Sequence, residues 1–223
     1  MSRHRPPLDS GCVMDACFVN ESVMVTGRKP ITSADVRTAA RLCAETLRPL
    51  AGQDWSVNAL NLRWNCRKTL DHVIDCLAWY AHDLANELTD EEGAARDGYR
   101  TAKPDRLVRG VETQAEVLAI IADAKPANAR AWHPWGVSDP EGFLAMGATE
   151  ILLHTWDIAE ALKVERADPA GFDDVAGRIL TRFFPAAPSG YSSFETLLYV
   201  TGRQQLNELP PVRRWRWHAA PVD

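Results

Sequence analysis

Apolar residues recur at the spacing of an α-helix in six stretches of the chain, and polar or glycine- and proline-containing segments separate them. The predicted helices cover residues 34–50, 66–88, 106–124, 140–162, 169–184 and 192–201. Five of them begin with capping signals: Thr32 or Ser33, Asn65, Asp139 and Asp168 as N-caps, the last two followed by proline, and a Ser192-x-x-Glu195 capping box. This pattern predicts an all-α fold, an up-and-down four-helix bundle with extra C-terminal helices. A short extended or β-like tail, RRWRWHAAPVD, follows.

The predicted fourth helix, residues 140–162, has almost no solvated face, yet it carries Glu150, His154 and Asp157. Positions four and seven apart lie on one stripe of a helix, so these three side chains are stacked along one line of an apolar surface. Burying a carboxylate is costly unless it is paired or bound to a cation, and this donor spacing suits a divalent metal. A Glu–His hydrogen bond inside a core is the alternative interpretation of the spacing.

A metal in a helical bundle takes its ligands from facing helices, so a third donor is expected on another long helix. His72, at the border of the narrow polar strip of the second helix, is the best placed. Cys76, one turn further on, forms a rival pair with His72, and a thiolate would favour zinc strongly. His82 lies within the polar strip and His133 in a loop, which makes both weaker choices.

Composition restricts the function classes. The chain has 223 residues, a net charge of −5 and 46% hydrophobic residues, as expected of one globular domain. Basic residues accumulate only in the last dozen positions, which argues against a nucleic-acid partner. No apolar run approaches the length of a membrane span or resembles a signal peptide. These features predict a cytoplasmic protein that does not bind membranes.

The opening of the chain, residues 1–30, shows neither helical nor strand periodicity and contains Met14 and Met24. We expect it to be a flexible arm, or to reflect a start assigned too far upstream. The five cysteines all fall in the first third of the chain, and their odd number and uneven spacing do not predict a disulfide framework. Cys12 and Cys17 lack a second pair that would complete a zinc site.

Two segments together resemble a known family: TLDHVIDCLAWYA on the second helix and ATEILLHTWDIAEAL on the fourth. They are similar to the DinB-like superfamily, and most closely to its actinobacterial branch of mycothiol-dependent maleylpyruvate isomerases and related mycothiol S-transferases. The resemblance implies that His72, Glu150 and His154 bind one divalent ion, zinc with nickel as the alternative, and that Asp157 occupies an acidic position beside it. It extends in looser form through LLYVTGRQQLNELP to the tryptophan-rich end.

The resemblance also implies a division of the chain and a function. Residues 31–165 would form the metal-binding bundle and residues 166–223 a helical extension with a tail. The expected function is a metal-dependent thiol transferase or isomerase that uses mycothiol, or a similar small thiol, on a small electrophile. Three protein ligands leave a coordination position open, as in catalytic zinc sites.

Two further residues have expected roles in this reaction. Asp157 would orient a ligand or shuttle a proton. Arg203 would anchor a carboxylate or thiol conjugate, unless it only interacts with the dipole of the preceding helix. The alternative function is a non-enzymatic metal-containing ligand-binding or stress-related protein of the same fold. The sequence leaves open the substrate and whether the protein is a monomer or a homodimer.

Overall fold

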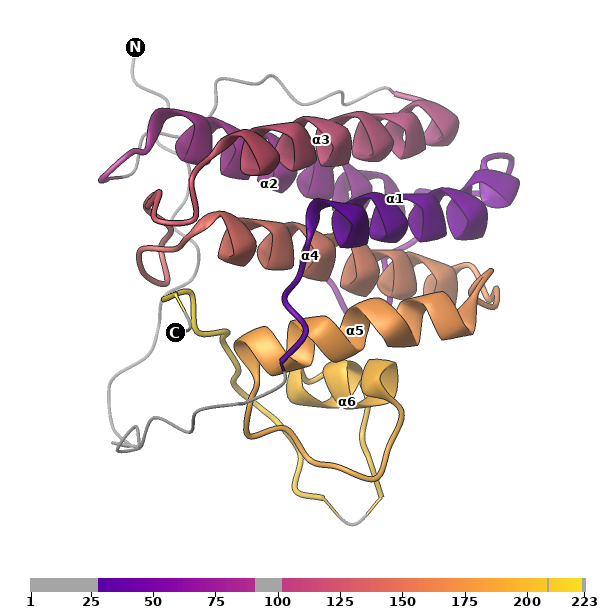
Figure 1. Cartoon of the computed structure of the whole chain (residues 1–223). Coiled ribbons are helices and arrows are strands. Elements are labelled where there is room, and N and C mark those ends of the chain that lie inside the picture. The colour runs from indigo at the N-terminus through magenta and orange to yellow at the C-terminus, as the bar shows by residue number, and fades with distance from the viewer. Residues whose placement is uncertain (1–27, 91–101, 208, 222–223) are drawn as a thin grey trace.

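The computed structural model describes residues 28–90, 102–207 and 209–221, so the predictions for the first 27 residues lie outside it. The described residues form helices and no strands, which confirms the predicted all-α fold (Figure 1). The elements are α1 Ser33–Leu47 with a 3-10 turn η1 Arg48–Leu50, α2 Cys66–Asn86, α3 Pro104–Ala124, α4 Pro140–Ala161, α5 Pro169–Phe183 and α6 Ser193–Val200. None of these helices is both long and apolar enough to span a bilayer.

The predicted capping residues begin their helices. The Asn65 side chain accepts a hydrogen bond from the backbone N–H of Lys68 at the start of α2. Asp139 and Asp168 accept equivalent bonds at the starts of α4 and α5, and Ser192 forms the capping box of α6. Each cap satisfies an N–H group that has no partner inside the helix, so the starts of these helices are encoded locally.

The order of helix directions differs from a simple up-and-down bundle, because α2 and α3 run parallel. Their C-terminal ends lie together: the Lys125 ammonium after α3 donates to the carbonyl of Ala85 and to the carboxylate of Glu87 at the end of α2. Figure 1 shows both helices ending at the same side of the bundle. Seventeen residues separate α2 from α3, a chain that can span ~55 Å when extended, whereas a 21-residue helix is ~32 Å long. The connection is therefore long enough to return along the bundle.

Helix α4 lies at the centre of the molecule and packs against α1, α2, α3 and α5 (Figure 1). A helix surrounded by other helices must be apolar on nearly every side, which explains why α4 lacks a solvated face. Gly147 allows a close approach of α2 and α3 to α4, since a Cβ added there would lie 2.7 Å from Cδ2 of Leu118 on α3 and 3.0 Å from Cδ2 of Leu77 on α2. His154 and Asp157 on α4 are consequently buried, and the Glu150 side chain is only 14% exposed.

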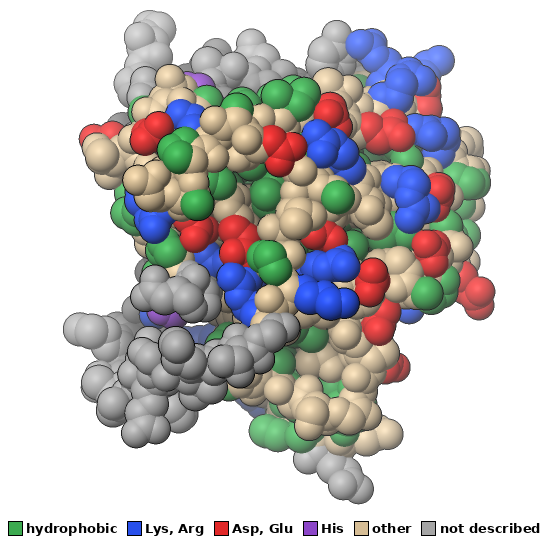
Figure 2. Space-filling view, in the orientation of Figure 1, with side chains coloured by type: hydrophobic (Ala, Val, Ile, Leu, Met, Phe, Trp, Pro, Cys, Tyr) green, Lys and Arg blue, Asp and Glu red, His purple; other side chains and the backbone are tan. Residues whose placement is uncertain are grey.

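The exposed faces of α1 and α3 are joined by ion pairs. Arg37 pairs with Glu116 and Arg48 with Glu112, and Arg41 pairs with Glu45 within α1. Acidic and basic side chains are interspersed on the face of the molecule shown in Figure 2. Pairs this exposed contribute little individually to stability.

Helices α5 and α6 and the C-terminal tail share the hydrophobic core with the bundle. Trp217 of the tail stacks on Phe183 of α5, with ring centroids 5.5 Å apart. The buried Arg182 guanidinium lies 3.2 Å from the carboxylate of Asp139 and donates to backbone carbonyls of the tail. The described part of the tail is extended and forms no strand. The division of the chain at residue 165 stays a prediction.

Candidate metal centre

Two polar stripes face each other between the antiparallel helices α2 and α4. The α2 stripe consists of His72, Cys76 and Tyr80, each one turn after the other, and the α4 stripe includes Glu150 and His154. Oε2 of Glu150 lies 3.8 Å from Nε2 of His72 and 3.3 Å from Nε2 of His154. The two imidazole rings are 5.5 Å apart, edge to face. The structure thus brings the three predicted metal ligands to one place.

Cys76 joins the same cluster. Its sulfur lies 3.4 Å from Nε2 of His72. Among the described residues, His72, Cys76 and Glu150 offer donor atoms that all lie within 4.8 Å of one another. Imidazole nitrogen, carboxylate oxygen and thiolate sulfur are the donors that zinc takes in proteins. The residues present therefore fit a zinc-like divalent cation, with Cys76 as an additional donor beside the predicted three.

His154 is oriented by its other ring nitrogen. Nδ1 of His154 lies 2.8 Å from Oδ2 of the buried Asp157, one helical turn further along α4. Because a carboxylate only accepts, this contact places a proton on Nδ1 and leaves Nε2, the atom that faces Glu150, as the coordinating nitrogen. A carboxylate behind a histidine in this way fixes its tautomer and ring orientation for a metal.

Arg203 completes this line of contacts behind the cluster. Its Nε and Nη2 each donate to one oxygen of Asp157 at 3.0 Å, a bidentate ion pair. Arg203 follows α6, where Gly202 has φ +69° and a Cβ would lie 3.0 Å from the carbonyl oxygen of Val212. Glycine adopts this left-handed conformation without steric cost, and the turn directs Arg203 onto α4. The structure therefore pairs the Arg203 guanidinium with Asp157 behind the His154 ring, and the roles expected of both residues in a reaction stay predictions.

The cluster carries a strong local field in the absence of a cation. Burial alone would raise the pKa of Glu150, but His154, His72 and Arg203 hold it at about 2, so Glu150 is a carboxylate. Burial alone would lower the pKa of His154, yet its hydrogen bonds to Asp157 and Glu150 raise it above the usual 6.5. Burial lowers the pKa of His72 more than the nearby Glu150 raises it. The metal-free protein therefore favours a proton on His154 and a neutral His72.

The cluster reaches solvent on the side of His72. The His72 side chain is 31% exposed, whereas those of Glu150 and His154 are 14% and 10% exposed. The Trp64 ring packs edge-on against His72, with ring centroids 4.8 Å apart. His72 is therefore the most exposed of the three predicted ligands, and the cluster lies nearest to solvent at this residue.

Two further residues lie beside the cluster: Tyr80, which the sequence pattern did not single out, and His133, which it ranked as a weaker ligand candidate. The buried Tyr80 hydroxyl interacts with Cys76 and Glu150, and burial followed by these two groups raises its pKa well above 10. His133, buried in the loop before α4, packs on the Tyr80 ring at 5.7 Å. Burial lowers the pKa of His133 to about 4, and its Nδ1 accepts from the backbone N–H of Trp135, which leaves the proton on Nε2. Tyr80 could have been found from the four-residue spacing of the α2 stripe, whereas the position of the loop residue His133 beside Tyr80 depends on packing and not on spacing.

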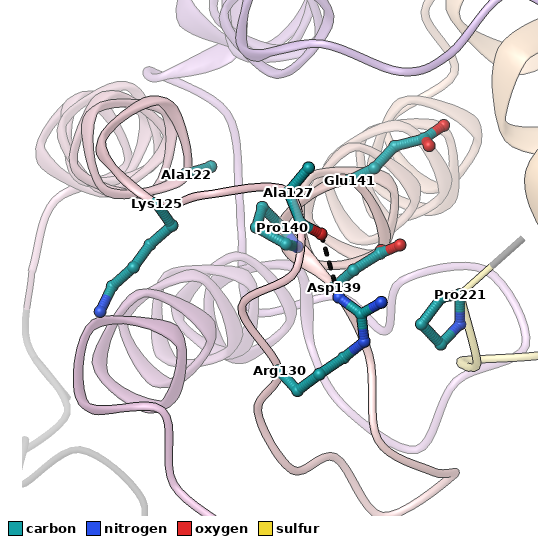
Figure 3. Close-up of a pocket in the computed structure, with 8 residues that line it drawn as sticks. All are labelled: Ala122, Lys125, Ala127, Arg130, Asp139, Pro140, Glu141 and Pro221. Atoms are coloured by element: carbon teal, nitrogen blue, oxygen red, sulfur yellow. Dashed lines mark hydrogen bonds between the residues drawn. The ribbon is translucent and has the colours of Figure 1, made fainter. Parts of the chain in front are cut away.

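A cavity of about 420 Å³ lies elsewhere, at the N-terminal end of α4 (Figure 3). Lys125, Arg130, Asp139 and Glu141 contribute charges of both signs to its wall. Glu150 lies eleven positions after Asp139, ~17 Å along the helix axis. This cavity is separate from the His–Cys–Glu cluster.

Comparison with known proteins gives one family match. A family model described as the mycothiol maleylpyruvate isomerase N-terminal domain matches residues 36–159, more than half of the 223-residue chain. The matched segment includes α2, all but the last two residues of α4 and every residue of the cluster, but it excludes Arg203. No curated protein and no solved structure matches the chain.

Proposed function

Because the chain belongs to the mycothiol maleylpyruvate isomerase N-terminal domain family, we propose that it is a metal-dependent enzyme that joins a low-molecular-weight thiol, of the mycothiol type, to a small electrophile for transfer or isomerisation. The observation that carries this proposal is the convergence of His72, Glu150 and His154 in a mostly buried cluster. This cluster has one solvent-facing side, through which a thiol and an electrophile can enter.

His72, Glu150 and His154 would hold a divalent cation, zinc first and nickel as the alternative. Such a cation, when bound, lowers the pKa of a thiol at its coordination sphere so that a thiolate forms near neutral pH. Glu150 supplies one negative charge to the site, and Asp157 keeps Nε2 of His154 available as a ligand.

The protein residues around the cluster have distinct parts in this proposal. Arg203 positions Asp157 through the bidentate pair, so it acts on His154 only through Asp157. The Tyr80 hydroxyl can donate a hydrogen bond or a proton toward the site, since its raised pKa keeps it protonated. The buried Tyr80 ring and the Trp64 ring, which packs on His72, cover part of the cluster and would disfavour hydrolysis of the electrophile.

Metal affinity should fall as the pH falls through the raised pKa of His154. A metal needs neutral imidazole, whereas the metal-free site favours a proton on His154, so the two compete already near neutral pH. The affinity should lose ~tenfold per pH unit below that pKa, for one proton displaced. His72, with its lowered pKa, should add to the slope only at lower pH. Competition titrations of zinc against a chelating dye between pH 8 and 5 measure this, and a flat profile would contradict it.

The proposed function is tested by titrating the zinc-loaded protein with mycothiol, cysteine and glutathione in a calorimeter, and then by adding maleylpyruvate and following its consumption. We expect one thiol to bind per metal, and turnover to require both the thiol and the metal. His82→Ala is the matched control, since His82 lies on α2 but pairs with Asp83 and not with the cluster. It should bind thiol and metal as the wild type does.

Two outcomes would count against an enzyme. If no thiol binds at millimolar concentration although the metal is present, the thiol chemistry is wrong. If a thiol binds but none of a panel of electrophiles, including epoxides and quinones, is consumed, the non-enzymatic ligand-binding function becomes the better account.

A further inference from the structure

We propose that Cys76 is a sulfur ligand of the metal centre, so that this chain binds its cation with two histidines, one glutamate and one cysteine. The inference rests on the metal site of the proposed function and adds a fourth donor to it. It assigns a specific property to this chain, namely a centre with an internal thiolate at the place where an external thiol would approach.

The positions of the donor atoms carry the inference. A tetrahedral site with bonds of ~2.0 Å to nitrogen or oxygen and ~2.3 Å to sulfur has edges of ~3.3–3.5 Å between ligand atoms. The sulfur of Cys76 lies 3.4 Å from Nε2 of His72, and Nε2 of His154 lies 3.3 Å from Oε2 of Glu150. The separation of His72 from Glu150, 3.8 Å, needs only a small side-chain adjustment. Cys76 thus stands at ligand spacing from His72 and within 4.8 Å of a donor atom of Glu150. His154 lies outside this group of three, so a centre with all four ligands requires its ring to move closer to the other donors.

The position of Cys76 next to His72 follows from the geometry of a single helix. His72 and Cys76 are one turn apart on α2, so the same backbone presents both toward α4. Cys76 is 8% exposed and lies against the Tyr80 hydroxyl, which can hydrogen-bond a sulfur that also bonds a metal. A surface cysteine at this spacing would lack such surroundings.

The sulfur ligand changes which metal ions the site binds most tightly. A dication balanced by the Glu150 carboxylate and the Cys76 thiolate has no net charge, on a simple count. Thiolate favours zinc or cobalt over magnesium and manganese, which prefer oxygen donors. An external thiol must then share the sphere with Cys76 or displace its sulfur, so its affinity should be higher in a variant that lacks this thiol.

Cobalt(II) provides the direct test, because cobalt bound to thiolate absorbs strongly in the near ultraviolet through charge transfer, while cobalt bound only to nitrogen and oxygen does not. The protein background would carry Cys12→Ser and Cys17→Ser, which removes two other thiols from the spectrum. We expect the band in this background and its loss in Cys76→Ser, together with at least ~tenfold weaker zinc binding. Cys66→Ser is the matched control: Cys66 is buried at the start of α2, and burial raises the pKa of its thiol to about 11.

A second measurement uses the protein without substitutions, so it does not depend on whether a variant folds. Zinc should slow alkylation of Cys76 by iodoacetamide at least tenfold in the full chain, as followed by peptide mass spectrometry. Bound cobalt without the charge-transfer band, or a band that persists in Cys76→Ser, would overturn the sulfur ligand and leave the three-ligand centre standing. Failure of the protein to bind cobalt or zinc at all would overturn this inference and the proposed metal centre together.

Discussion

Replacing His154 with alanine should abolish stoichiometric metal binding while the helical content stays close to that of the wild type. His154 supplies the one ring nitrogen that faces Glu150 on the same helix, and its orientation is set by Asp157. Removal of the imidazole leaves Asp157 paired with Arg203, so no buried carboxylate loses its last partner. Metal content by mass spectrometry and helicity by circular dichroism measure the two parts of the prediction.

The same measurements on two other variants sharpen this result. His72→Ala should lose most of the metal, and His82→Ala on the same helix should keep it all. Full metal retention in His154→Ala would remove His154 from the ligand set. If His72→Ala retains its metal, Cys76, whose sulfur lies one turn away, becomes the better assignment for the ligand on α2.

Replacing Asp157 with alanine should destabilise the metal-free protein by ~3–5 kcal/mol, because the loss of one partner leaves a buried charge unpaired. Asp157 is 1% exposed, and the side chain of Arg203, which would lose its bidentate partner, is 12% exposed. His154 would at the same time lose the acceptor for its Nδ1 proton. Urea unfolding of the metal-free protein separates this structural effect from metal binding.

The exposed pair on α1 is the matched control for this prediction. Glu45 and Arg41 also form an ion pair, at 2.7 Å, but their side chains are 44% and 49% exposed. Glu45→Ala should therefore cost less than ~1 kcal/mol. A similarly small loss for Asp157→Ala would show that the contact with Arg203 does not hold in solution.

Asp157→Asn, which keeps the shape of the side chain, should slow turnover more than it reduces metal content.

The sequence by itself determined the helices and the register of the donors within each helix. Helical periodicity is a local property, so the stripes containing His72 with Cys76 and Glu150 with His154 follow from spacing alone. Capping is also local, and Asn65 begins α2 as predicted. The lack of a polar face on α4 indicated correctly that this helix lies inside the bundle. The two segments on α2 and α4 also identified the family.

The tertiary structure alone decided how these local elements meet. Short connections join antiparallel helices, but the long connection between α2 and α3 allows either direction, and here the helices are parallel. Arg203 reaches Asp157 from 46 residues away, through a turn whose direction no periodic pattern encodes. His133 arrives beside Tyr80 from a loop. Such contacts depend on the path of the whole chain, because helix spacing places side chains within a helix while packing places the helices relative to one another.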